Sequence, residues 1–170
     1  MSRIPLITER DGLDERRTVV FDAVVESRGS IIRPYQVLLH APGIALPAAE
    51  LGGQIRYHGS LPDQHRELAI LTTARICVCQ FEWDSHVDTA RSAGVSPGAI
   101  THLMGESGEA SPEEALIIAF VRELSNHRTV TDEMFTQIKT LVGDEGVVEL
   151  ATLVGYYTLL GYVMNVADIC

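Results

Sequence analysis

Four residues with side chains suited to catalysis, Glu67, Cys79, Glu82 and His86, lie in one short stretch of this sequence. If residues 79–93 form one helix, Cys79, Glu82 and His86 stand at positions i, i+3 and i+7 and share a face. An imidazole moves protons at neutral pH, and a carboxylate beside it can fix its tautomer or donate a proton itself. The spacing therefore predicts a proton-transfer site, in which Glu67 orients His86 and Glu82 either donates a proton or is a hydrogen-bonding partner of the imidazole.

Cys79 allows two interpretations. At the start of a helix and beside an imidazole, its thiol would lose a proton readily and act as a nucleophile or reductant. A free cysteine is also a common small buried residue, and Cys79 would then only line the pocket. The other two cysteines, Cys77 and Cys170, are interpreted as structural or incidental. Three cysteines, an odd number, do not form a disulfide framework, so we expect a reducing, cytoplasmic environment.

The other catalytic candidates have structural alternatives. His86 could be held by a backbone carbonyl, and Glu67 could be a solvated charge paired with Arg66 or Arg75. The helix face is also a potential metal site, because its thiol, carboxylate and imidazole are all metal ligands. No second ligand pair such as HExxH accompanies them, so we expect neither a metal nor another cofactor.

The two segments around residue 78 must position these groups. Residues 63–78 carry Glu67 and are predicted to form a helix with an apolar side. Consecutive helices joined by a short turn pack as neighbours. We therefore expect Glu67 to reach His86 from the preceding helix.

The rest of the chain also predicts helices, and no stretch shows strand alternation or an internal repeat. Start signals at Asp14, Ser111 and Thr131 and stop signals at Gly29 and Gly94 mark their ends. The fold class is therefore all-α, a single-domain helical bundle over residues 1–170 with an irregular N-terminal arm at 1–12. The other expected helices cover approximately residues 13–28, 34–41, 44–58, 97–104, 112–126, 131–142 and 145–168.

Two adjacent glycines and one apolar stretch allow more than one structural interpretation. Gly52-Gly53 either weakens the helix over residues 44–58 or marks close packing against a neighbour. The segment at 150–164, LATLVGYYTLLGYVM, is too short for a comfortable membrane span, so we expect it in the core or in a subunit interface. Its tyrosines Tyr156, Tyr157 and Tyr162 are expected to be core or interface residues.

Charge limits the partners. Asp and Glu outnumber Lys and Arg by 23 to 13, which gives a formal net charge of −10. Such a surface opposes binding to nucleic acid and to anionic membranes. The N-terminal sequence lacks a basic segment followed by an apolar one, so we expect no signal peptide.

The spacing of the central residues resembles that of the carboxymuconolactone decarboxylase superfamily, which includes the alkylhydroperoxidase D-like proteins. The resemblance implies a helical bundle that oligomerises as a trimer or a hexamer, with its site near subunit contacts. The alkylhydroperoxidase branch has Cys-x-x-Cys before the histidine, whereas Glu82 stands at the second cysteine position here. The matching residues are Arg66-Glu67-Leu68, Cys79, His86 and Ala90-Arg91-x-Ala93-Gly94-Val95-Ser96.

These observations favour a cofactor-free, homo-oligomeric enzyme that acts on a small organic acid or lactone. In a decarboxylation, His86 or Glu82 would protonate the carbon after CO₂ leaves. One alternative is a thiol-dependent hydroperoxide reductase that uses Cys79 and an external resolving thiol. Another is an oligomeric binding protein that has the fold without turnover.

Overall fold

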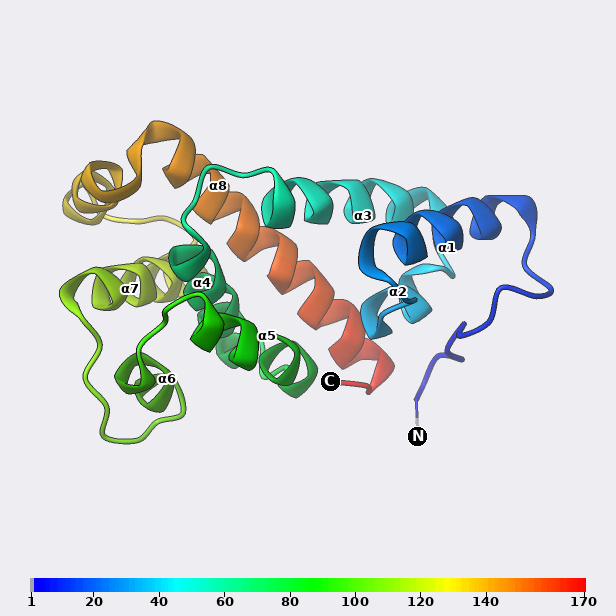
Figure 1. Ribbon diagram of the computed structural model, residues 1–170, viewed down its shortest axis with the longest axis horizontal. Coiled ribbons are helices and arrows are strands. Elements are labelled where there is room, and N and C mark those ends of the chain that lie inside the picture. Colours follow the sequence, from blue (N-terminus) through cyan, green and yellow to red (C-terminus); the bar gives the residue numbers. More distant parts are fainter. Residues whose placement is uncertain (1) are drawn as a thin grey trace.

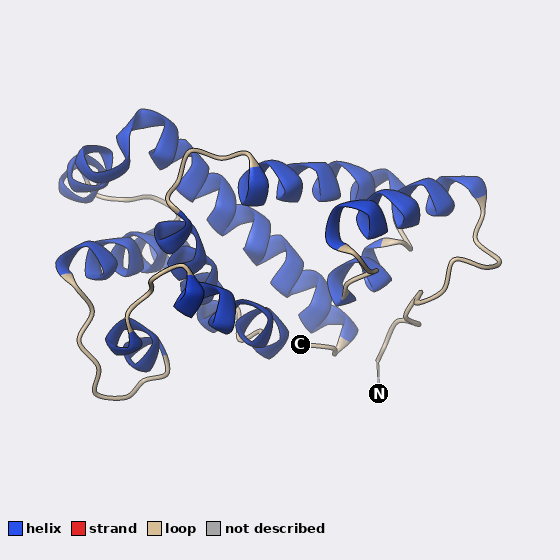
Figure 2. Ribbon diagram, viewed as in Figure 1, coloured by secondary structure: helices blue, strands red, loops and turns tan. Residues whose placement is uncertain are grey.

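The computed structural model describes residues 2–170, and within that range it contains eight helices and no strand, which confirms the all-α prediction (Figure 2). The helices are α1 (Glu15–Arg28), α2 (Arg33–Leu38), α3 (Pro42–Tyr57), α4 (Asp63–Ile76), α5 (Gln80–Ser92), α6 (Pro97–Leu103), α7 (Pro112–His127) and α8 (Asp132–Ala167).

Helix α8 is the centre of the bundle. It runs diagonally between α1, α2 and α3 on one side and α4, α5 and α7 on the other (Figure 1). Helix α4 packs against α5, α7 and α8, and five of its residues are completely buried: Leu68, Ala69, Ile70, Leu71 and Thr73. By length and composition α8 could also cross a membrane, but 44% of its most apolar window is buried inside the bundle. The apolar stretch at 150–164 thus lies on the central helix.

Several helix ends follow the predicted signals. Asp14 caps α1 by accepting a hydrogen bond from the Arg17 N–H, and Gly29 ends that helix in the left-handed conformation. Ser111 and Glu114 form a capping box at the start of α7. The buried Glu114 carboxylate also accepts bonds from the N–H and hydroxyl of Ser96, so it joins the starts of α6 and α7.

Gly143 interrupts α8 where the sequence predicts a break. Its backbone has φ 72° and ψ 178°, which is non-helical, but the helix resumes directly after it. The two expected helices are therefore one kinked element. Glycine tolerates this positive φ because it has no Cβ.

Gly52 marks close packing, the second of the two sequence interpretations. A Cβ at this position would lie 2.1 Å from the Tyr156 hydroxyl oxygen, whereas one at Gly53 would contact nothing. The Tyr156 hydroxyl is in turn 2.8 Å from the Tyr35 hydroxyl, in a buried hydrogen bond. Gly52 thus lets α3 approach α8 beside the cavity described below.

Residues 2–12 form no helix, as predicted for the N-terminal arm. The arm lies along the bundle because the Arg3 N–H bonds to the Ala167 carbonyl and the Ile7 N–H to the Gln36 carbonyl. It therefore runs past α2 to the end of α8.

Candidate functional site

Glu67 and His86 meet as predicted. They lie on the neighbouring helices α4 and α5, and the His86 Nδ1 atom is 2.8 Å from the Glu67 Oε2 atom. Only 2% of Glu67 and 4% of His86 is exposed, so the pair is shielded from water. Because the carboxylate accepts this bond, Nδ1 carries the proton and Nε2 is left free to exchange one. Arg66 Nε lies 3.7 Å from the other Glu67 oxygen and adds a positive charge beside the pair.

Glu82 lies on the other side of the imidazole. Its Oε2 atom is 3.7 Å from His86 Nε2, one helical turn along α5. Burial raises the pKa of the Glu82 carboxyl, although the charges of His86 and Arg56 oppose the increase. Glu82 therefore retains its proton to higher pH than an exposed glutamate, which suits a proton donor.

Glu82 and His86 border a cavity of about 210 Å³. This volume is sufficient for a small organic molecule, and the imidazole forms part of the cavity wall. The lining comes from α1, the α1–α2 connection, α3, α5 and α8, and comprises Arg28, Ile32, Arg56, Phe81, Glu82, Ser85, His86, Tyr156, Tyr157 and Leu160.

Two arginines in this lining were not predicted from the sequence. Arg28 is fixed by a 2.9 Å hydrogen bond from its guanidinium to the Ala49 carbonyl. Burial favours a lower pKa for Arg56, but the nearby groups Tyr157, Tyr57 and Glu67 outweigh it, so the pKa is raised and the side chain stays cationic. The spacing of Arg28 and Arg56 from residues 67–86 in the sequence does not predict that they lie near the site. Only the fold reveals this positive side of the cavity.

Tyr156 and Tyr157 are core residues, as predicted, but they also line the cavity. The Tyr157 ring stands edge-on to the His86 imidazole, with 5.4 Å between their centres. Burial raises the pKa of the Tyr157 phenol well above its usual value, so it stays neutral and can donate a hydrogen bond. Tyr162, by contrast, is 62% exposed.

Cys79 requires a correction. It is the residue before α5 rather than part of the helix, and it forms a disulfide with Cys170. The predictions of a free Cys79 thiol and an incidental Cys170 were therefore wrong for this structure. Ninety-one positions separate the two cysteines in sequence, so only the folding of α8 against α4 brings them together. Cys79 is also absent from the cavity lining given above.

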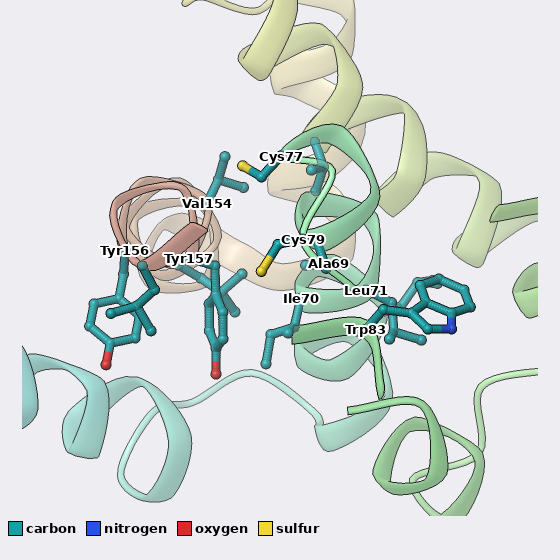
Figure 3. Packing of buried hydrophobic residues seen from close by; sticks show 14 of the residues in the cluster. Ala69, Ile70, Leu71, Cys77, Cys79, Trp83, Val154, Tyr156 and Tyr157 are labelled. Carbon is teal, nitrogen blue, oxygen red and sulfur yellow. The ribbon is translucent and has the colours of Figure 1, made fainter. Parts of the chain in front are cut away.

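Cys77 is the free cysteine, and burial raises the pKa of its thiol. Figure 3 shows the Cys79 sulfur on the side of Tyr157, whereas the Cys77 sulfur points away from it. Val78 between them has a positive φ of 53°, which is unfavourable for a β-branched residue. This turn ends α4 and sets the direction in which Cys79 points.

Trp83 occupies the opposite side of α5 from the cavity. Figure 3 places its ring away from Tyr157, and the Arg75 guanidinium lies 5.3 Å from the ring centre. The indole is 7% exposed. It anchors α5 while Glu82 and His86 face the cavity.

Two histidines that precede His86 in the chain, His65 and His58, do not join this cluster. His65 is buried beside Glu113, with 3.8 Å between His65 Nε2 and the carboxylate, and His58 is exposed at the end of α3. Within residues 2–170 no three His, Cys, Asp or Glu side chains are arranged to hold a metal ion. The assembled groups are suited to proton transfer.

Comparison with known proteins agrees with the sequence resemblance. Residues 44–120, which include α4 and α5 with Glu67, Glu82 and His86, match the model of the carboxymuconolactone decarboxylase family. A search of curated proteins finds no match.

Proposed function

Through residues 44–120 this chain belongs to the carboxymuconolactone decarboxylase superfamily, and we propose that it is an enzyme that decarboxylates a small organic acid or lactone acid by proton transfer. The observation that carries the proposal is the buried array of Glu67, His86 and Glu82, whose imidazole and outer carboxyl border a cavity with two arginines.

The charges on the cavity wall fit an anionic substrate. Arg28 and Arg56 supply positive charge, and a guanidinium binds a carboxylate with two parallel hydrogen bonds. Glu82 with a raised pKa adds little negative charge when it is protonated, so it does not repel the anion. The cavity therefore favours a small acid over a neutral or cationic molecule of the same size.

These positions support a decarboxylation in which the cavity groups supply a proton. When the C–C bond to the substrate carboxylate breaks, CO₂ leaves and the electron pair remains as an enolate. The arginines stabilise its negative charge, and Glu82 or His86 delivers a proton to the carbon. The Glu67 carboxylate holds Nδ1–H, so that Nε2 of His86 can regain a proton for the next cycle.

The test is CO₂ release from a panel of β-keto acids and lactone acids. We expect His86→Gln and Glu67→Gln to lower kcat at least ~100-fold, as for loss of a positioned acid–base group. Arg56→Gln should mainly raise KM for the anionic substrate. His127→Gln, at an exposed position on α7, is the matched control and should retain full activity. A His86→Gln variant that converts substrate at the wild-type rate would contradict the proposed mechanism.

If no acid in the panel yields product, binding of the acids must be measured separately. Small acids that bind to the wild-type protein but never react would identify it as a binding protein. Isothermal titration with the same acids distinguishes the two cases.

One observation favours a second function, thiol-dependent reduction of a hydroperoxide. The partner of Cys79 is internal, because Cys170 is bonded to it. In such a cycle the Cys79 thiolate attacks the O–O bond, becomes a sulfenic acid and releases the other peroxide oxygen as an alcohol. The Cys170 thiol then displaces water to form the disulfide, and an external dithiol reduces this disulfide to complete the cycle. Cys170→Ser should then accumulate a sulfenic acid at Cys79 that dimedone traps after peroxide treatment. An unmodified Cys79 would exclude this cycle.

A further inference from the structure

We propose that Cys79–Cys170 is a reversible thiol–disulfide exchange site whose redox state sets how the two walls of the cavity are held together. The inference rests on the disulfide and on the position of the cavity. It does not depend on which reaction the cavity performs.

The disulfide joins the elements that carry most of the cavity lining. Cys79 immediately precedes α5, whose first residues include the lining groups Phe81 and Glu82. Cys170 follows α8, which contributes Tyr157 and Leu160. A covalent bond between these two points therefore limits the separation of the α5 wall from the α8 wall.

Noncovalent contacts at the same place would keep the fold intact without the bond. The Asn165 side chain donates a 2.7 Å hydrogen bond to the Cys77 carbonyl, and the Arg33 guanidinium donates to the Ile169 carbonyl. Gly161 packs against the same turn, where an added Cβ would lie 2.9 Å from the Cys77 Cβ. Reduction is thus expected to loosen the end of α8 locally and to leave the bundle folded.

The exposure of the two cysteines gives the exchange a direction. Cys79 is 2% exposed, whereas Cys170 is only partly buried, so an external thiolate reaches the Cys170 sulfur first. Its attack breaks the S–S bond and forms a mixed disulfide on Cys170. Cys79 departs as a thiolate at the N-terminus of α5, where the backbone N–H groups favour negative charge.

A dithiol completes the reduction. Its second thiolate attacks the mixed disulfide, releases Cys170 and leaves as a cyclic or protein disulfide, while Cys79 and Cys170 each take up one proton. Two electrons pass from the dithiol to the cysteine pair. The co-reactant is therefore a small dithiol or a dithiol protein, and the reverse reaction restores the bond.

The first measurement is alkylation of the native protein after treatment with dithiothreitol, followed by mass spectrometry of the cysteine peptides. We expect Cys79 and Cys170 to become alkylated together without denaturant, and removal of the reductant in air to restore the disulfide. Brief treatment with glutathione should place a mixed disulfide on Cys170 rather than on Cys79. A disulfide that opens only in denaturant, or two thiols that never pair in the oxidised protein, would overturn the proposal.

The second measurement is amide hydrogen exchange in the oxidised and reduced states. Reduction should speed exchange in the first turn of α5 and in the last turns of α8, and leave α7 unchanged. Cys170→Ser should show the faster pattern with or without dithiothreitol, whereas Cys77→Ser, which keeps the pair, should switch like the wild type. Identical exchange in both states would show that the bond does not act on the cavity walls.

Discussion

Glu82 is the single residue whose environment most clearly changes its acid–base behaviour. It is buried next to His86, and burial raises the pKa of its carboxyl despite the opposing charges of His86 and Arg56. A carboxyl with a higher pKa in the folded state binds more protons when folded than when unfolded. The contribution of Glu82 to the stability of the folded protein therefore decreases as the pH rises above about 4.3, the usual pKa of glutamate.

The decrease of this stability contribution with rising pH leads to a prediction for Glu82→Gln. Glutamine does not titrate, so the free energy of unfolding of the variant, relative to the wild type, should increase as the pH rises from about 4 toward 8. Urea unfolding at a series of pH values measures this difference. Glu106→Gln, at an exposed position, controls for the amide substitution itself. A Glu82→Gln difference that does not change with pH would contradict the assigned environment.

The contact between α3 and α8 shows how one element adjusts to another. Gly52 leaves room for the Tyr156 ring, and the Tyr156 hydroxyl then reaches Tyr35 on α2. Gly53, the next residue on α3, meets nothing within 4 Å of an added Cβ. Two adjacent glycines in one helix therefore have different reasons to be there.

Alanine substitutions at the two positions distinguish the close contact at Gly52 from the open position at Gly53. Gly52→Ala should lower the free energy of unfolding by about 1 to 3 kcal/mol, because the new methyl group overlaps Tyr156 and forces it to shift. Gly53→Ala should instead be neutral or add up to about 1 kcal/mol, because alanine is the better helix former. Thermal and urea unfolding measure both. Equal effects at the two positions would contradict the close contact at Gly52.

At the scale of the whole molecule, the outer surface of α3 and α8 is a candidate for contact with other copies of the chain. Apolar side chains are exposed there, among them Ile44 at 57%, Leu51 at 42% and Leu159 at 38%. They border an apolar groove in which Gly155 presents no side chain. Family resemblance implies an oligomer, and this face is our proposal for the contact between copies.

Light scattering after size-exclusion chromatography tests that proposal. The wild type is expected to elute with the mass of a trimer or hexamer, and Leu51→Glu should reduce the mass to that of the monomer by burying a charge in the contact. Met104→Glu, which also replaces an exposed apolar residue but lies at the end of α6, should leave the assembly unchanged. A wild-type monomer at all concentrations would rule out this interface.

Sequence reasoning succeeded where distances along the chain are short. The His86–Glu82 contact follows from helical spacing, and the His86–Glu67 contact follows from two consecutive helices that pack together. Helix starts with polar caps were predictable for the same reason, because their hydrogen bonds are local.

Prediction from the sequence failed where the fold brings together segments that are distant in the chain. Arg28 and Arg56 reach the cavity from α1 and α3, and no periodicity relates them to α5. Cys170 meets Cys79 only because α8 crosses the bundle and ends beside the start of α5. The positive side of the cavity and the redox pair therefore depend on tertiary packing, which a single sequence does not encode in any local pattern.

Trp83 is the chain's only tryptophan, and it sits on the helix that also carries Glu82 and His86. Its indole is buried against the Arg75 guanidinium, so its emission depends on how α5 lies on α4. Light emitted on selective indole excitation therefore comes from this one helix alone. A displacement of α5 on α4, whether caused by occupation of the cavity or by opening of the bond at Cys79, would therefore change this emission without an attached dye.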